Sequence, residues 1–149
     1  MTISIFVRDV DPEFSMKVCG ECNGHGYIAD GAECFACYNG RVTEYVYPEG
    51  MEPISMSNVN AATVIAAIDK QFNPKDPCGY WDRDRMSVVL AVVEAMLATD
   101  AYDFLVRDTK VEGRVTHMGI DSSYLKQRLE QIKSMILAAR KAGKTLGYA

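Results

Sequence analysis

Two motifs, Cys19-Gly-Glu-Cys22 and Cys34-Phe-Ala-Cys37, lie 11 residues apart in the N-terminal third of the chain. Each places two thiols on one tight turn, and two such pairs supply the four sulfur ligands of a tetrahedral zinc site. The spacing therefore predicts that Cys19, Cys22, Cys34 and Cys37 bind one zinc ion. Four thiolates leave no coordination position for a water molecule, so the predicted role of the zinc is structural.

Three other uses of these cysteines are weighed against zinc. Two disulfides need an oxidising compartment, and the first ten residues contain no secretory signal. A redox Cys-x-x-Cys pair is expected at a helix N-terminus, whereas both motifs here lie in turns rich in glycine and asparagine. His25 can replace one ligand, although the four thiols favour a polar loop role for it. Cys78 is left over and is expected to be a buried free thiol.

The stretches CGECNGHG (19–26) and CFACYNG (34–40) resemble one pair of the CxxCxGxG repeats in the cysteine-rich domain of DnaJ-type co-chaperones. The second copy departs from the repeat at Asn39, where the pattern has glycine, and the chain has no J-domain motif. The resemblance implies a zinc β-hairpin. It also suggests one function, a zinc-stabilised protein-binding or regulatory module. Tyr27, Phe35 and Tyr38 would anchor its partner, unless these rings pack around the metal.

The predicted fold class is α+β, with a zinc-binding β module over residues 1–50 and a mainly helical domain over 51–149. Stretches 2–8 and 41–47 are rich in β-branched and aromatic residues and predict strands. Apolar spacing predicts helices over 58–72, from Asp82 or Asp84 to about Asp103, and from an Asp121 cap onward. A β-hairpin is expected near 108–120, turning at Glu112-Gly113. Trp81, in a connector, is expected to anchor that connector rather than to bind a ligand.

Charge is distributed unevenly along the 149 residues. The whole chain has a net charge of −4, but residues 126–149 carry six basic side chains and one acidic one, which gives +5. Basic residues in the last turn of a helix complement its dipole, which is one explanation of this pattern. The other is a basic helix and tail that dock on an acidic partner. The predicted partner-binding residues are Arg140, Lys141, Lys144 and Tyr148.

The order helix, hairpin, helix and basic tail over residues 84–149 resembles the W-type head-tail joining proteins of tailed bacteriophages. The resemblance is carried by the stretches 101–105, 113–115, 123–129 and 140–148. It implies a viral structural protein, a head-tail adaptor or connector in the neck of the virion. Its partners would be copies of itself in a homo-oligomeric ring and portal or tail proteins. If the co-chaperone-like function holds instead, we expect a cytoplasmic protein.

Other functional classes have less support in the sequence. The chain lacks a phosphate-binding glycine loop and a Ser/His/Asp set, so we predict that it is not an enzyme. Nucleic-acid binding is not expected, because residues 17–42 contain two basic residues against three acidic ones. The longest apolar run, 88–98, includes Glu94 and is much shorter than the ~20 residues of a membrane span, so no membrane association is expected.

Overall fold

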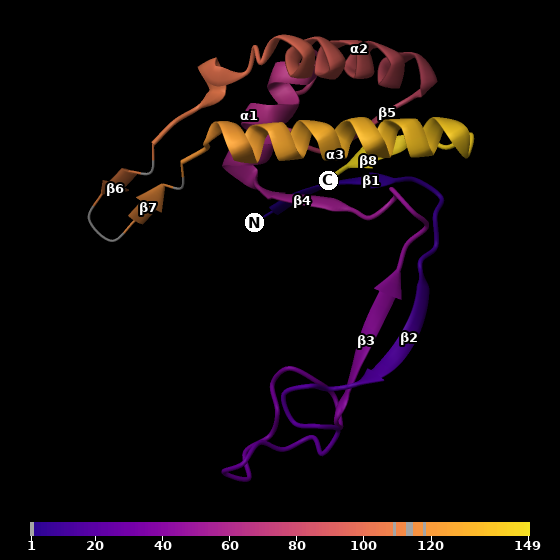
Figure 1. Cartoon of the computed structure of the whole chain (residues 1–149), viewed down its shortest axis with the longest axis vertical. Helices are drawn as coiled ribbons and strands as arrows, with labels where there is room; N and C mark the ends of the chain where they lie inside the picture. The colour runs from indigo at the N-terminus through magenta and orange to yellow at the C-terminus, as the bar shows by residue number, and fades with distance from the viewer. Residues whose placement is uncertain (1, 109, 113–114, 118) are drawn as a thin grey trace. The chain divides into compact units, whose positions relative to one another are not determined.

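The computed structural model describes residues 2–108, 110–112, 115–117 and 119–149. The chain divides into two compact units. The larger unit consists of residues up to Asp9 together with Glu49–Ala149, and the smaller unit is Val10–Pro48. Both contain antiparallel β-structure and the larger one also contains the helices, so the fold is α+β, as predicted (Figure 1).

A four-stranded antiparallel sheet forms one layer of the larger unit. Its strands are β1 (Thr2–Val7), β4 (Ile54–Ser57), β5 (Gly79–Trp81) and β8 (Leu146–Tyr148), in the order β4-β1-β8-β5. Along β1 the side chains alternate, with Ile3, Ile5 and Val7 buried. This alternation gives the sheet one buried face, which is the face that the helices cover.

Helices α1 (Asn58–Ile68), α2 (Arg83–Thr99) and α3 (Ser122–Lys141) lie on the same side of this sheet (Figure 1). Each begins after a residue whose side-chain oxygen accepts a backbone N–H, namely Ser57, Asp82 and Asp121. Such caps satisfy the free donors of a first helical turn. The apolar stripe predicted for the last helix forms the core: Leu125, Leu129, Ile132 and Ile136 are fully buried.

Between α2 and α3 the backbone forms a hairpin of β6 (Lys110–Glu112) and β7 (Val115–His117). The predicted hairpin near 108–120 is therefore confirmed. Its predicted turn includes Gly113, which lies outside the described residues. Helix α2 ends before Asp100, which adopts a left-handed φ of +49°, so the helix is shorter than the predicted end near Asp103. A 3₁₀ turn, Asp103–Leu105, follows.

Two predictions about the larger unit are wrong. The boundary predicted near residue 50 agrees with the division between Pro48 and Glu49, but the assignment of the first strand to the zinc module is wrong, because β1 pairs with β4 and β8 of the larger unit. The sequence also predicts a basic tail after the last helix, yet β8, in this segment, lies inside the sheet between β1 and β5. The domain over 51–149 is therefore less helical than expected. Strand propensity identifies a strand but carries no information about distant pairing partners.

The smaller unit is a two-stranded ribbon that carries the cysteine loops. Strand β2 (Glu13–Val18) pairs antiparallel with β3 (Arg41–Val46), and residues 19–40 connect the two strands. The prediction of a strand over 41–47 is confirmed, whereas its partner β2 was not predicted. Every residue of β2 is exposed. Among the described residues of the chain, no helix is both long and apolar enough to cross a lipid bilayer.

Candidate metal centre

Backbone hydrogen bonds hold the two cysteine motifs against each other in a reciprocal arrangement. The N–H of Cys19 donates to the carbonyl of Gly40 over 2.8 Å. The N–H of Cys34 donates to the carbonyl of Gly26 over 2.9 Å. The first cysteine of each motif is thus tied to the residues that follow the other motif. This pairing brings two segments 15 residues apart into one site.

Asn-Gly turns follow both motifs. Asn23 and Gly24 have φ values of +49° and +84°, and Asn39 and Gly40 have +50° and +79°. Two successive positive φ values are typical of the type I′ turn, for which Asn-Gly is the preferred pair. Asn39, the departure from the co-chaperone repeat, therefore adopts a conformation that asparagine tolerates better than most residues. A Cβ atom at Gly40 would lie 2.0 Å from the Gly24 carbonyl oxygen, so glycine is required there.

The four predicted ligands converge on one point. All four Sγ atoms lie within 4.8 Å of one another. The distance is 3.9 Å between the sulfurs of Cys19 and Cys34, and 3.6 Å between those of Cys22 and Cys37. Zn–S bonds of ~2.3 Å in a tetrahedron place sulfurs about 3.8 Å apart, whereas a disulfide needs ~2.05 Å. The geometry therefore fits a metal ion, and the prediction of a four-cysteine metal-binding group is confirmed.

The interior of the smaller unit consists of these thiols. Its buried residues are Cys19, Cys22, Cys34 and Gly40, and the half-buried Cys37 and Val42 pack against the three buried cysteines. No isoleucine, leucine or aromatic ring is buried anywhere in Val10–Pro48, a segment described in full. So small an apolar interior cannot offset the conformational entropy of ordering the loops. A metal bond network can supply that free energy.

The thiols differ in how readily they ionise. Burial raises the pKa of Cys22, but hydrogen bonds from the Gly26 N–H and the Cys37 thiol outweigh this effect and lower its pKa to about 7. The Gly26 nitrogen lies 3.2 Å from the Cys22 sulfur. Burial, followed by hydrogen bonding with Cys22 and Cys34, raises the pKa of Cys37 to about 12. The Cys22 thiol is thus more readily ionised than the Cys37 thiol, from which metal binding must displace a proton.

Aromatic side chains of the cysteine loops do not pack around the thiols. Phe35 is 98% exposed, Tyr38 is 81% exposed and Tyr27 is 58% exposed. The interpretation of these rings as packing around the metal is therefore wrong, and their predicted exposure is confirmed. His25 is exposed and does not belong to the thiol group.

The four predicted partner-binding residues near the C-terminus do not form one surface. Arg140 and Lys141 are exposed on the last turn of α3. Lys144 donates from Nζ to the carbonyl of Asp9 over 2.7 Å, which ties it to the end of β1. Tyr148 is only 8% exposed, and its ring packs in the core against Phe72 and Trp81, so its predicted role in binding is wrong. Tyr148 lies in β8 (Leu146–Tyr148), and three residues are too few to show an alternation of buried and exposed side chains in the sequence.

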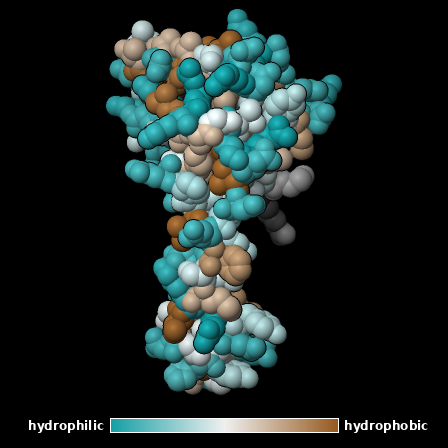
Figure 2. Space-filling view, turned by 90° about the vertical axis from the view of Figure 1, so that its right-hand side faces the viewer, coloured by the Kyte–Doolittle hydropathy of each residue, from teal (hydrophilic) through white to brown (hydrophobic). Residues whose placement is uncertain are grey.

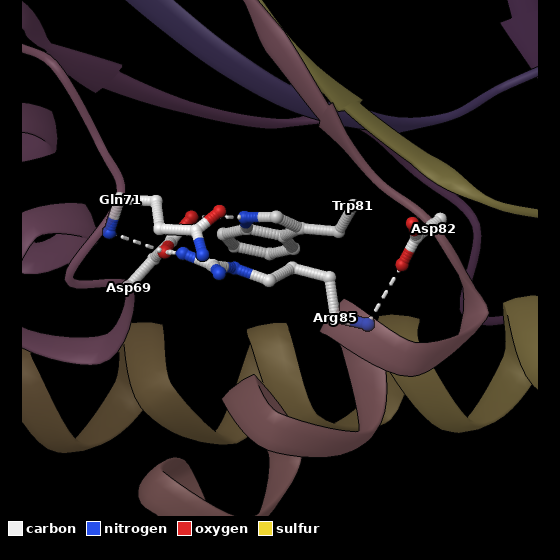
Figure 3. Close-up of polar contacts among 5 residues, drawn as sticks. All are labelled: Asp69, Gln71, Trp81, Asp82 and Arg85. Atoms are coloured by element: carbon white, nitrogen blue, oxygen red, sulfur yellow. Dashed lines mark hydrogen bonds and ion pairs between the residues drawn. The ribbon is translucent and has the colours of Figure 1, made fainter.

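A buried polar cluster in the larger unit was not predicted from the sequence (Figure 3). Asp69, at the C-terminal cap of α1, accepts hydrogen bonds from the Trp81 indole nitrogen over 2.8 Å and from the Gln71 N–H over 2.9 Å. It also forms an ion pair with Arg85. The cluster joins α1, β5 and the first turn of α2, and it confirms that Trp81 is an anchor. The sequence contains one indication of this cluster. A carboxylate at a helix C-terminus is unfavourable to the helix dipole, so Asp69 needs a compensating partner.

The remaining cysteine differs from expectation. Cys78 is exposed in the connector before β5, so its expected burial is wrong. The converging thiols of the smaller unit are thus the one group in the described part of the chain with metal-ligand geometry. Comparisons with protein-family models, with curated proteins and with solved structures found no match.

Proposed function

We propose that this protein is a zinc-stabilised protein-interaction module, in which the metal holds residues 10–48 in shape and their surface binds a protein partner. The proposal rests on which side chains of this unit are buried, because they are the opposite of those buried in most domains. This unit buries thiols and a glycine while its large apolar residues lie outside. Metal ligation replaces the apolar core, which frees the apolar side chains for contact with another molecule.

Zinc is the ion that this ligand set supports best. Thiolates are soft ligands that favour zinc over magnesium or calcium, and tetrahedral sulfur coordination is typical of structural zinc. Sulfur separations of 3.6 and 3.9 Å lie on either side of the value expected for that geometry. Cys19, Cys22, Cys34 and Cys37 would fill the coordination sphere, which supports a structural role for the ion.

One face of the β2–β3 ribbon supplies an apolar surface. Antiparallel register places Phe14 opposite Tyr45, and Met16 and Val18 follow on the same face as Phe14. These four side chains, here called the ribbon face, are between 55% and 74% exposed. Figure 2 shows hydrophobic residues at the surface of this unit among hydrophilic ones. Contiguous exposed apolar side chains of this kind mark interaction sites.

Affinity capture with the full chain tests this function. We expect wild-type protein to retain a specific partner that is lost when Phe14→Ser and Tyr45→Ser are combined. Zinc content should stay unchanged, because neither side chain is part of the thiol interior. The control is Phe104→Ser, which alters a ring of the larger unit that is 75% exposed. Equal capture by all three proteins would contradict the proposal.

A second candidate function is the head-tail adaptor of a tailed phage. It is supported by the order of α2, the β6–β7 hairpin and α3, and by the exposed bases Arg140 and Lys141 at the end of α3. In that role the chain would assemble into a ring and bind portal or tail proteins in the virion neck. The test is the mass of the protein in solution, measured alone and in a mixture with portal protein. A protein that stays monomeric and does not bind portal protein would contradict this function.

A further inference from the structure

The tip of the smaller unit, residues 18–40, combines negative charge with exposed aromatic rings. It contains Glu21, Asp30 and Glu33 and has neither lysine nor arginine. All three carboxylates are exposed. A zinc ion held by four thiolates would add a net charge of −2 at the same place. The tip therefore presents a local negative field, which attracts cationic groups of a partner.

Two of the rings and one carboxylate line a single hollow of about 370 Å³ beside the thiols of Cys34 and Cys37. Tyr27 and Glu33 are direct partners in an antiparallel β-bridge, so their side chains leave the backbone on the same side. Tyr38 reaches the same hollow from the turn that follows the second motif. Arg41, the β-bridge partner of Tyr38, does not line the hollow, whereas His25 and Asn39 do.

We propose that this hollow receives a lysine or arginine side chain of a protein partner, an inference that rests on the proposed protein-binding function. Aromatic faces attract a cation through their quadrupole, and a carboxylate within reach adds a charge-assisted hydrogen bond. Tyr27 and Tyr38 provide aromatic rings in the lining, and Glu33 provides the carboxylate. An anionic or purely aliphatic side chain would gain neither interaction. The recognised partner segment is therefore basic.

Defined peptides test the inference without knowledge of the natural partner. The probe is a fluorescein-labelled Gly-Ser peptide that carries lysines, and the matched peptide has glutamine at the same positions. Fluorescence anisotropy with the zinc-loaded full chain at low ionic strength gives both dissociation constants. We expect the lysine peptide to bind about tenfold more tightly than the glutamine peptide. Equal affinities overturn the proposal.

Variants separate the hollow from the general negative field. Glu33→Gln should weaken lysine-peptide binding about threefold, the scale of an exposed ion pair. Tyr38→Leu should weaken it about two- to fivefold, whereas Tyr27→Phe keeps an aromatic face and should change it less than about twofold. Asp30→Asn removes the same charge from a residue that does not line the hollow, and should have little effect. An equal loss in Asp30→Asn and Glu33→Gln overturns the proposal.

Failure of this inference can be told apart from failure of the proposed function. If Phe14→Ser with Tyr45→Ser abolishes capture of the natural partner while Glu33→Gln does not change it, the module binds protein but the hollow does not select a cation. If neither variant alters capture, the protein-binding function itself is wrong. Zinc content, measured for every variant, excludes loss of the fold as the cause.

Discussion

The two units of this chain have interiors of different chemistry. The larger unit encloses a conventional core in which Ile5, Ile65, Trp81 and Leu129 are fully buried. The smaller unit encloses thiols, and Phe35 is almost entirely exposed. Burial of apolar area stabilises the first unit at about 25 cal/mol per Å². We expect the second to gain its free energy from metal coordination, in which case its stability would depend on a bound ion.

The largest effect should come from breaking the thiol group. Cys22→Ser removes one of the four ligands, and structural zinc sites contribute on the order of 10–16 kcal/mol in small peptides. We expect zinc loss and unfolding of residues 10–48, while the helices of the larger unit keep their circular dichroism signal. Elemental analysis measures the zinc. Cys78→Ser changes an exposed thiol outside the group and should retain one zinc per chain. Full zinc content in Cys22→Ser would refute the four-thiolate assignment.

A smaller effect, confined to the larger unit, is expected from Asp69→Asn. Its side chain is 2% exposed and pairs with Arg85, so the substitution leaves a largely buried guanidinium without its counter-ion. We expect a loss of about 3 kcal/mol in the free energy of unfolding, measured by urea denaturation. Glu94→Gln disrupts the exposed pair with Lys133 and should cost less than about 1 kcal/mol. Similar losses in both variants would mean that burial of the cluster is unimportant.

Glycine substitutions in the cysteine loops should produce a still smaller difference. Gly40→Ala places a Cβ against the Gly24 carbonyl at a positive φ, which costs about 1–3 kcal/mol. This strain corresponds to a loss of zinc affinity of about fivefold to 150-fold. A methyl group at Gly20 would meet no atom within 4 Å beyond its chain neighbours, so Gly20→Ala should change the affinity little. Competition with a chromophoric chelator measures both affinities. A larger loss of zinc affinity in Gly20→Ala than in Gly40→Ala would contradict the close approach of the two turns.

The smallest effect on stability is expected from Phe35→Ala. Because this ring is 98% exposed, its removal should change the unfolding free energy by less than about 0.5 kcal/mol and leave zinc bound. Leu129→Ala, a comparable truncation in the core of the larger unit, should cost about 2–5 kcal/mol. Thermal denaturation of the two variants compares them. A large loss in Phe35→Ala would show that the ring is packed in solution.

Local patterns in the sequence predicted the ligands and the helices. The spacing of Cys19, Cys22, Cys34 and Cys37 is itself the signature of a metal site, and the stripe from Leu125 to Ile136 follows the helical period over several turns. Both signals lie within short windows. Both patterns can therefore be recognised without knowledge of how the rest of the chain folds.

Long-range features were not predictable in the same way. β5 and β8 are three-residue strands, too short for an alternating pattern, and β8 is a strand only because β1 and β5 pair with it. The same dependence explains why the sequence wrongly predicts a surface role for Tyr148. Asp69 belongs to the core only because Trp81 and Arg85 arrive from other elements. Tertiary partners decide these positions, and local propensity does not encode them.

Hydrogen exchange of the full chain, with and without a zinc chelator, is the sharpest test of whether metal alone holds the smaller unit in shape. We predict that chelation abolishes protection of backbone amides such as Cys19 and Cys34, which are hydrogen-bonded across the two motifs. Amides in the core of the larger unit should keep their protection. Persistent protection of residues 19–40 without metal, or simultaneous loss of protection in both units, would contradict the metal-dependent fold.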